Sequence, residues 1–534
     1  MKRFFYLGLL SLAVLCFSAS VVYGQPWDGN GVDGDPYQIW TAEDMQAIGA
    51  DANYWGAHFK LMKDIDLGSY TGTSFNIIGN PYTPHFTGVF DGNEYTISNF
   101  TYTSPDANFI GLFACVGNNG KVKQLVMQNV NASGNWFTAG LVGMNFGKIY
   151  DCTITGTISG NNSTGGLAGE NYGEISDCSV TAQVQGIDET GGLAGDNHGT
   201  ILDCYANSNV DGNSVTGGLV GKNIGLSSDG LISWSYATGE VSGDNYNTGG
   251  LVGINSYGTV SYCYATGNID ANNGVGGLVG WNVYSTISNC YSTASVLGDE
   301  HIGGLVGDNG RSTISNCYSA GVVDGNDDTG GLIGDDHDGT ITGCFWDVES
   351  SGQSSSDGPE VGKSTADMKK ESTFTDADWD FTTPIWKMCD GPDYPKLWWE
   401  VCPLAVEVRL TPQMLNCQSE GNWVKAHVIL PEGYWPEDID VNTPAVAEPM
   451  GVESEYIKVL DNGKGKFGVE IGFEREAFCA AGLESEDGYL EVKVTGWLLT
   501  GQQFEGTDTI KVISQRWRHR ERITTIRRGV REIR

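Results

Sequence analysis

Basic residues are scarce in this 534-residue chain, which has 30 lysines and arginines against 66 aspartates and glutamates. Between residues 139 and 345 the only lysines and arginines are Lys148, Lys222 and Arg311. An acidic surface repels nucleic acid and other anionic polymers. Lyases that cleave acidic polysaccharides typically hold and deprotonate the anionic sugar with arginine or lysine. The composition therefore argues against a nucleic-acid partner and against a polyanion lyase.

Motifs that mark catalytic or metal sites are also missing. The chain has no Cys-x-x-Cys pair, no His-Glu-x-x-His sequence and no Gly-x-Ser-x-Gly elbow, and its seven histidines are scattered without the spacing of metal ligands. The first two motifs bind metals or carry redox chemistry, and the third holds a nucleophilic serine. We predict that the protein is not an enzyme and that it has no metal site.

Long apolar runs are confined to the first residues. Residues 1–24 begin with Lys2 and Arg3, continue through an apolar run and end in small residues, which is typical of a signal peptide. An uncleaved membrane anchor is the alternative. No later segment is apolar enough to span a bilayer, so we expect a secreted or cell-surface protein without an integral membrane segment after signal cleavage.

Glycine, by contrast, is abundant, and much of it lies in a repeat. Gly-Leu-Val-Gly or a close variant recurs with its leucine at Leu141, Leu167, Leu193, Leu219, Leu251, Leu278, Leu305 and Leu332. The steps between these leucines are 26, 26, 26, 32, 27, 27 and 27 residues. Self-similarity at such a period indicates a solenoid or another repeat array.

Further columns keep the same register. They hold an asparagine two residues after the second glycine (Asn145 to Asn309, then Asp336), a branched residue (Ile149 to Ile341), a cysteine (Cys152 to Cys344, with Ser235 once) and a valine or isoleucine (Ile158 to Val323). Each copy thus offers three short β-prone pieces separated by turns. One copy cannot bury its apolar side alone, but stacked copies can.

These columns predict an all-β fold whose main part is a right-handed parallel β-helix with ladders of Leu, Ile, Cys and Val in its core. Adjacent strands lie about 4.8 Å apart, so eight clear copies form a rod roughly 40 Å long before its ends are added. A leucine-rich repeat needs more leucines per unit, and a propeller blade needs a longer period.

The repeats resemble the GLUG-motif repeats of bacterial secreted and surface proteins, most clearly over residues 139–345, and we place the repeat β-helix at residues 86–348. Residues 25–85 are expected to form the N-terminal cap and first strands, where Thr41 and Asp44 start a helix as a capping box. The resemblance implies extracellular display, adhesion or binding.

The end of the chain has a different pattern. Residues 349–402 are interpreted as a linker and the C-terminal cap of the solenoid, and residues 403–514 alternate apolar and polar residues between turns, which predicts a small antiparallel β-sandwich. Residues 515–534 form a basic tail to which we assign no function.

Cysteine usage separates into two kinds. The seven repeat cysteines fall in one column of parallel strands, where a stack of small buried side chains is expected rather than a chain of bonds. Cys389 with Cys402 and Cys417 with Cys479 are interpreted as disulfide pairs.

An aromatic residue follows the repeat cysteine in most copies. If the cysteines point inward, these side chains point outward and form a stripe that can stack on sugar rings or on a partner protein. The predicted binding residues are Tyr205, Tyr236, Tyr264, Tyr291 and Tyr318. The alternative is that the rings only stack on each other and shield the sheet.

We therefore predict a non-catalytic protein for adhesion or extracellular binding, with an extracellular glycan or a surface protein as partner. No cofactor is predicted, and calcium on the acidic turns at 325–331 and 335–340 is the open alternative. Two further hypotheses are a structural spacer and a glycan-cleaving enzyme. The second would use paired carboxylates such as Asp299 with Glu300 or Asp335 with Asp336.

Overall fold

The structure is a computed structural model that describes residues 27–225, 230–383, 385–389, 393–417, 421–448, 450–460, 468–484, 489–500 and 502–513. The predicted signal peptide (1–24) and basic tail (515–534) lie outside these residues. The chain divides into two compact units, residues 1–363 and 364–534. Each unit is described by itself.

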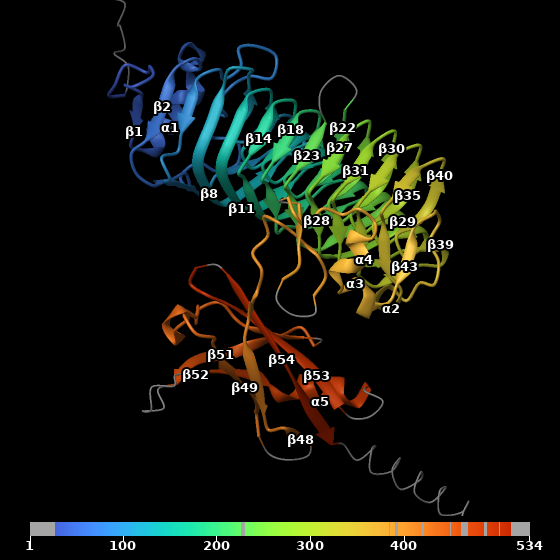
Figure 1. The fold of residues 1–534 in the computed structure, drawn as a ribbon. Coiled ribbons are helices and arrows are strands. Elements are labelled where there is room, and N and C mark those ends of the chain that lie inside the picture. The colour runs from blue at the N-terminus through green and yellow to red at the C-terminus, as the bar shows by residue number, and fades with distance from the viewer. Residues whose placement is uncertain are drawn as a thin grey trace, which may run out of the picture. The chain divides into compact units, whose positions relative to one another are not determined.

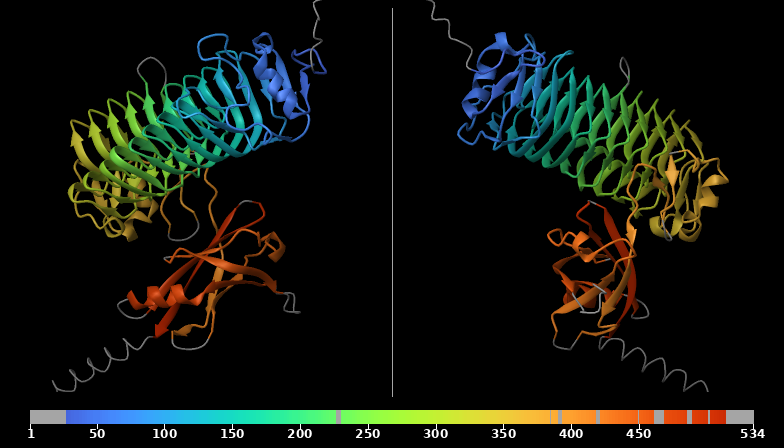
Figure 2. Two further views of the ribbon diagram at one scale, coloured as in Figure 1. Left: turned by 180° about the vertical axis from the view of Figure 1, so that it is seen from behind. Right: turned by 60° about the vertical axis from the view of Figure 1, so that its left-hand side comes forward.

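The first unit is a parallel β-solenoid of about 11 turns, which confirms the predicted β-helix. Figures 1 and 2 show its strands stacked coil upon coil from the blue end to the yellow end. One coil consists of β12 (Asn162–Gly165), β13 (Ala168–Asn171), β14 (Glu174–Ser176) and β15 (Ser179–Gln185), and the next of β16 (Asp188–Gly191), β17 (Ala194–Asn197), β18 (Thr200–Leu202), β19 (Tyr205–Ala206) and β20 (Asn209–Gly212).

The strands assemble into one sheet of 34 strands and one of nine. The nine-stranded sheet contains β7 (Phe113–Val116), β10 (Val142–Asn145), β13, β17, β22 (Val220–Ile224), β26 (Val252–Ser256), β30 (Val279–Val283), β35 (Val306–Gly310) and β40 (Ile333–His337). Its strands pair in parallel with like residues opposite like residues, for example Asn145 with Asn171 and Asn171 with Asn197. The repeat period of the sequence is therefore the register of the sheet.

The glycines of the repeat are explained by close backbone contact. A Cβ atom on Gly192 would lie 2.1 Å from the carbonyl oxygen of Gly218 in the next coil, and one on Gly195 would lie 2.4 Å from the backbone of Ser163. No side chain fits at these distances. The leucine between these glycines, Leu193, is fully buried in the core.

Both ends of the solenoid are closed by local structure. The helix α1 (Ala42–Ala50) lies at the N-terminal end and starts with the predicted capping box, in which Thr41 Oγ1 accepts a hydrogen bond from the Asp44 amide at 3.1 Å. At the other end, β43 (Val361–Lys363) pairs with β42 (Phe345–Asp347) after the short helix α2 (Val348–Ser351). Of the segment 349–402, residues 349–363 thus belong to the solenoid.

The second unit begins with the helices α3 (Thr365–Met368) and α4 (Glu371–Thr375) and the antiparallel pair β44 (Trp386–Lys387) and β45 (Lys396–Leu397). A mostly antiparallel sheet of nine strands follows, with an apolar core that includes Leu410, Phe473 and Phe504. Its strands are β46 (Leu404–Ala405), β47 (Glu407–Thr411), β48 (Met414–Asn416), β49 (Trp423–Ile429), β50 (Val446–Glu448), β51 (Val452–Leu460), β52 (Gly468–Glu474), β53 (Tyr489–Trp497) and β54 (Gln503–Ile513), with α5 (Arg475–Glu484) between β52 and β53.

Cysteines behave as the sequence indicates. The disulfides Cys389–Cys402 and Cys417–Cys479 are both present, so the two predicted pairs are confirmed. The repeat cysteines are free and buried in the solenoid. Cys178 Sγ donates to the carbonyl oxygen of Ser176 at 3.1 Å, and burial raises the pKa of the Cys115 thiol to about 12. The burial of these thiols in the core makes them packing groups of the solenoid.

Candidate functional site

The predicted tyrosine column forms a continuous stack on the 34-stranded sheet. Successive rings from Tyr205 to Tyr318 lie 4.8–5.0 Å apart between centroids, and their planes differ by 3–9°. Each inner ring therefore uses both of its faces to contact neighbouring tyrosines. A sugar ring, which stacks on an aromatic face, meets only the edges and hydroxyl groups of this column.

The prediction that all five tyrosines offer an outward binding surface is wrong for two of them. Tyr205 is 39% exposed, and Tyr236 and Tyr264 are half-buried, but Tyr291 and Tyr318 are fully buried. In these two residues the edges are covered as well as the faces. The interpretation that the rings stack on each other and shield the sheet describes the observed geometry better.

A groove lies on the same outward face as the tyrosines, a few residues further along the strands. It has a volume of about 610 Å³ and crosses β15, β20, β25 (Val241–Gly249), β29 (Asn268–Gly276) and β33 (Ser295–Leu297). Its exposed polar side chains are Gln183, Asn209, Asp211, Glu240, Asn268 and Asp270. Strand alternation places these residues outward, between buried valines and isoleucines such as Val210 and Ile269.

The groove combines hydrogen-bond acceptors with amide donors. Asp211 accepts hydrogen bonds from Gln185 Nε2 at 3.1 Å and from Ser242 Oγ at 3.0 Å, which holds its carboxylate in place. The carboxylates of Glu240 and Asp270 also line the groove, and its lining contains no lysine or arginine. This chemistry suits the hydroxyl groups of a neutral ligand and disfavours an anionic one.

The nine-stranded sheet carries a second arrangement, the asparagine ladder. It consists of Asn145, Asn171, Asn197, Asn223, Asn255, Asn282, Asn309 and Asp336. Each asparagine donates through Nδ2 to the side-chain oxygen of the next member at 2.6–2.9 Å. All seven asparagines are fully buried. The ladder therefore satisfies its own buried polar groups along the solenoid.

Two columns of varied residues flank this ladder. The preceding column is Met144, Glu170, Asp196, Lys222, Ile254, Trp281, Asp308 and Asp335, and the following column is Phe146, Tyr172, His198, Ile224, Ser256, Val283, Gly310 and His337. We call them the flanking columns. They change residue type from coil to coil while the ladder between them does not.

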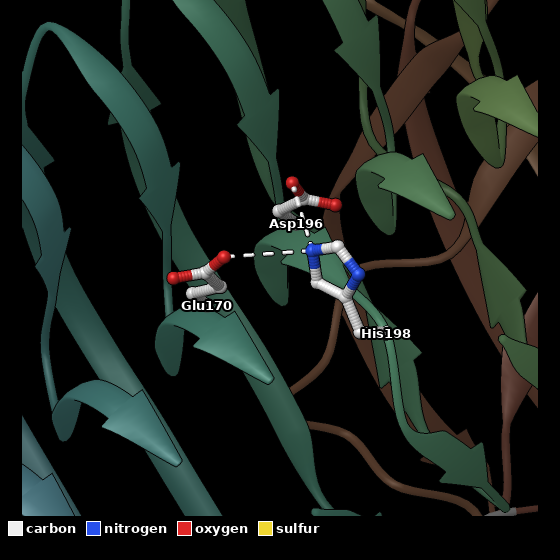
Figure 3. Close-up of side chains that lie close together, drawn as sticks. All are labelled: Glu170, Asp196 and His198. Atoms are coloured by element: carbon white, nitrogen blue, oxygen red, sulfur yellow. Dashed lines mark ion pairs between the residues drawn. The ribbon is translucent and has the colours of Figure 1, made fainter. Parts of the chain in front are cut away.

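Three ionisable residues of the flanking columns meet on β13 and β17. His198 Nε2 lies 3.4 Å from Glu170 Oε1 and 3.4 Å from Asp196 Oδ2, so that both carboxylates point at one ring nitrogen (Figure 3). The Tyr172 hydroxyl donates to Glu170 Oε1 at 2.7 Å, and the Tyr172 ring stacks on His198 with centroids 4.5 Å apart. We call Glu170, Asp196 and His198 the acidic–histidine cluster.

The electrostatics of this cluster differ from those of an exposed surface. Burial alone would lower the pKa of His198, but hydrogen bonds and charge from Asp196 and Glu170 raise it to about 9. Burial raises the pKa of the Asp196 carboxyl, against the opposing effect of His198. Burial and the neighbouring Glu170 also raise the pKa of Tyr172. The site therefore concentrates charge in a partly water-excluded position.

A second group of acidic residues and histidines lies near the C-terminal end of the solenoid. His301 Nε2 is 3.5 Å from Asp328 Oδ2 and 3.6 Å from Asp335 Oδ2, and His337 Nε2 is 3.0 Å from Asp335 Oδ2. Asp336 instead accepts the last bond of the asparagine ladder. The predicted pair Asp335 and Asp336 is thus divided between an outward group and a buried ladder.

Sequence reasoning missed the acidic–histidine cluster because it searched for ligand spacing along the chain. In a solenoid, residues one period apart are neighbours, and Glu170 and Asp196 are opposite each other in adjacent strands. His198 follows Asp196 by two positions. Comparing the flanking columns between successive repeats would have brought the three residues together.

The described part of the chain contains no helix long and apolar enough to cross a membrane. Comparison with known proteins matches the family of the GLUG motif at residues 160–185, 244–270 and 271–297.

Two relatives match part of the chain. Halomucin of Haloquadratum walsbyi is 33% identical over 137 residues, which is 24% of this chain and 2% of that protein. A protein of Evansella cellulosilytica described as a Gly-rich membrane protein is 35% identical over 139 residues, which is 24% of this chain and 15% of that protein. The chain therefore spans only a small part of either relative. Three stretches of the solenoid thus match the GLUG motif.

Proposed function

We propose that this chain is a non-catalytic surface or secreted protein whose solenoid binds a neutral extracellular glycan in the groove of β20, β25 and β29. The groove carries the proposal, because it offers several carboxylate and amide groups over an open length of repeated strands. Sugar hydroxyls both donate and accept hydrogen bonds. Carboxylates can accept from them, and side-chain amides can both donate to them and accept from them. The tyrosine edges of Tyr205 and Tyr236 extend the same outward face.

A surface location is supported by the GLUG repeats and by the names of the two relatives, one a halomucin and one a membrane protein. The leading segment 1–24 and the oxidised cysteine pairs are consistent with export. Repeat solenoids present extended surfaces on which successive coils contact one elongated partner. This geometry supports the proposal of an adhesive role.

Binding without cleavage is proposed because hydrogen bonding accounts for the chemistry of the groove. Asp211 accepts two side-chain hydrogen bonds, which hold its carboxylate as an acceptor. No cofactor is required for hydrogen bonding of this kind. Calcium on the acidic turns is the alternative, and binding is therefore measured with and without it.

The experiment is a glycan-array screen of the purified mature protein with and without calcium. An Asn268→Ala/Asp270→Ala variant removes two exposed groove residues, and a Tyr236→Ala/Tyr264→Ala variant removes two residues of the tyrosine column. We expect binding of neutral glycans that falls about fivefold or more in the groove variant, since each of the two lost hydrogen bonds contributes about 0.5–1.5 kcal/mol. The tyrosine variant should change binding less.

Three outcomes would overturn parts of this proposal. Absence of glycan binding by the folded protein, in both conditions, would point to a protein partner or a spacer. Shortened glycans detected by mass spectrometry after incubation would point to the glycan-cleaving alternative. If only the tyrosine variant loses binding, the stripe rather than the groove is the site.

A further inference from the structure

We propose that Glu170, Asp196 and His198 bind a late first-row divalent metal ion, with Zn²⁺ as the best match, through two carboxylate oxygens and the imidazole Nε2. These three donor atoms converge from adjacent coils of the nine-stranded sheet (Figure 3). The site is separate from the proposed glycan groove and does not depend on it.

The distances within the cluster suit a metal better than they suit direct ion pairs. Both nitrogen–oxygen distances are 3.4 Å, whereas charge-assisted hydrogen bonds from nitrogen to a carboxylate are about 2.7–2.9 Å long. Ligands of tetrahedral Zn²⁺ lie about 2.0–2.1 Å from the metal, which places neighbouring ligand atoms about 3.3–3.4 Å apart. The two observed nitrogen–oxygen distances of 3.4 Å agree with this distance between neighbouring ligand atoms.

A second observation points to a missing ligand. Asp196 is only 6% exposed, and its Oδ1 atom is buried without a hydrogen-bond partner among the described residues. Its Oδ2 atom belongs to the cluster, so the unpartnered oxygen is on the same carboxylate that faces His198. A buried carboxylate oxygen without a partner is costly. A cation bound by this carboxylate offsets part of that cost, because it compensates the buried negative charge that the two oxygens share.

The surroundings hold the ligands in place. The Tyr172 hydroxyl donates to Glu170 and its ring stacks on His198, which fixes one ligand by a hydrogen bond and another by packing. The nearby Lys222 ammonium pairs with Glu189 at 2.9 Å. Such supporting contacts around the ligands are typical of metal sites.

The donor set distinguishes between metals. Calcium takes six to eight oxygen ligands, and magnesium keeps several waters in octahedral geometry. A site with one imidazole and two carboxylates is better suited to Zn²⁺ or a similar transition metal. Three protein ligands leave a fourth position for water or for a donor from another molecule. The ion would also join two adjacent coils.

The test is a Zn²⁺ titration of the tag-free full chain by calorimetry after treatment with a chelator. Two variants are compared with the unchanged chain. His198→Gln removes one proposed ligand, and His301→Gln is the matched control in the more exposed group near Asp328. Co²⁺ replaces Zn²⁺ in a parallel experiment, because its visible spectrum reports tetrahedral coordination.

We expect one Zn²⁺ per chain whose affinity falls about 100-fold or more in His198→Gln and is unchanged in His301→Gln, together with a tetrahedral Co²⁺ spectrum in the unchanged chain only. A rise in Tm with Zn²⁺ should accompany binding, since a ligand of the folded state stabilises it. Equal affinities in the unchanged chain and His198→Gln would overturn the proposal. So would loss of binding in His301→Gln with retention in His198→Gln. Circular dichroism confirms that both variants are folded.

Discussion

The asparagine ladder and its flanking columns occupy neighbouring positions on the same strands but have opposite characters. Ladder residues such as Asn197 are fully buried and bond to the equivalent residue of the next coil. One position earlier, the same strands carry Glu170, Asp196, Lys222 or Trp281. The ladder repeats because each member completes the hydrogen bonds of its neighbours, and the flanking columns vary because no such constraint applies to them.

The difference teaches where stability and binding are located in a repeat protein of this kind. A repeated residue contributes through contact with identical residues above and below, so its effect on the fold is large and the same in each coil. A varied residue contributes through the particular neighbours that its coil provides. Binding sites in the solenoid are therefore expected where the flanking columns differ, as in the acidic–histidine cluster.

The largest effect should come from breaking the ladder. Asn255 donates to Asn282 and accepts from Asn223, both at 2.9 Å, so Asn255→Ala removes the ladder partner of one Asn223 N–H and of the Asn282 side-chain oxygen, both buried, while Asn223 keeps its bond to the Gly230 carbonyl oxygen. We expect the free energy of unfolding to fall by about 2–4 kcal/mol, because each unsatisfied buried group costs about 1–3 kcal/mol. Urea unfolding followed by circular dichroism measures the change.

The adjacent Ser256 gives the matched control for that comparison. Its side chain is half-buried in a flanking column, and Ser256→Ala should change stability by less than about 0.5 kcal/mol. Equal losses in the two variants would contradict the distinction between the ladder and its flanks.

A smaller effect is expected in the tyrosine column, where position along the stack matters. Tyr264 lies between two stacked rings, at 4.8 Å and 5.0 Å, whereas Tyr205 starts the column against Tyr236. Aromatic pairs contribute about 0.5–1.5 kcal/mol each beyond the area they bury. Tyr264→Ala should therefore destabilise the fold more than Tyr205→Ala in the same unfolding assay, and the reverse order would show that stacking does not stabilise the column.

A pH-dependent effect is expected in the metal-free protein. The folded-state pKa of His198 is about 9, above its ordinary value, so its charge stabilises the fold fully below about pH 6.5, and this contribution is lost as pH rises through 9. The groups that face it are Glu170, Asp196 and the Tyr172 hydroxyl. The stability difference between the unchanged chain and His198→Gln in EDTA should be larger at pH 6 than at pH 10.

His198→Gln also loses the stacking on Tyr172, but this loss is the same at both pH values. It therefore cancels when the stability difference at pH 6 is compared with the difference at pH 10. A difference that is the same at pH 6 and pH 10 would mean that the carboxylates do not act on the His198 charge.

The sequence predicted the solenoid well because the columns of Leu, Ile, Cys and Asn each perform one repeated task. It also predicted the Thr41 capping box and both disulfides. The tyrosine column was placed correctly on the sheet, yet the repeat pattern did not predict that Tyr291 and Tyr318 are buried while Tyr205 is exposed. The acidic–histidine cluster was missed because its residues are close only when one coil is placed on the next.

The asparagine ladder fixes one backbone geometry in every coil, and the flanking columns place different side chains on it. Ile254, Ser256, Trp281 and Val283 occupy the positions of Glu170, Tyr172, Asp196 and His198 in a later pair of coils, and Ile254 is opposite Trp281 as Glu170 is opposite Asp196. A variant with Ile254→Glu, Ser256→Tyr, Trp281→Asp and Val283→His transfers the cluster to those coils.

The decisive measurement is the number of Zn²⁺ ions bound per chain, determined by equilibrium dialysis and elemental analysis in the unchanged and transferred proteins. The account predicts one tight ion in the unchanged chain and two in the transferred one. One ion in both proteins would contradict the equivalence of the coils, and none in either would contradict the metal site itself.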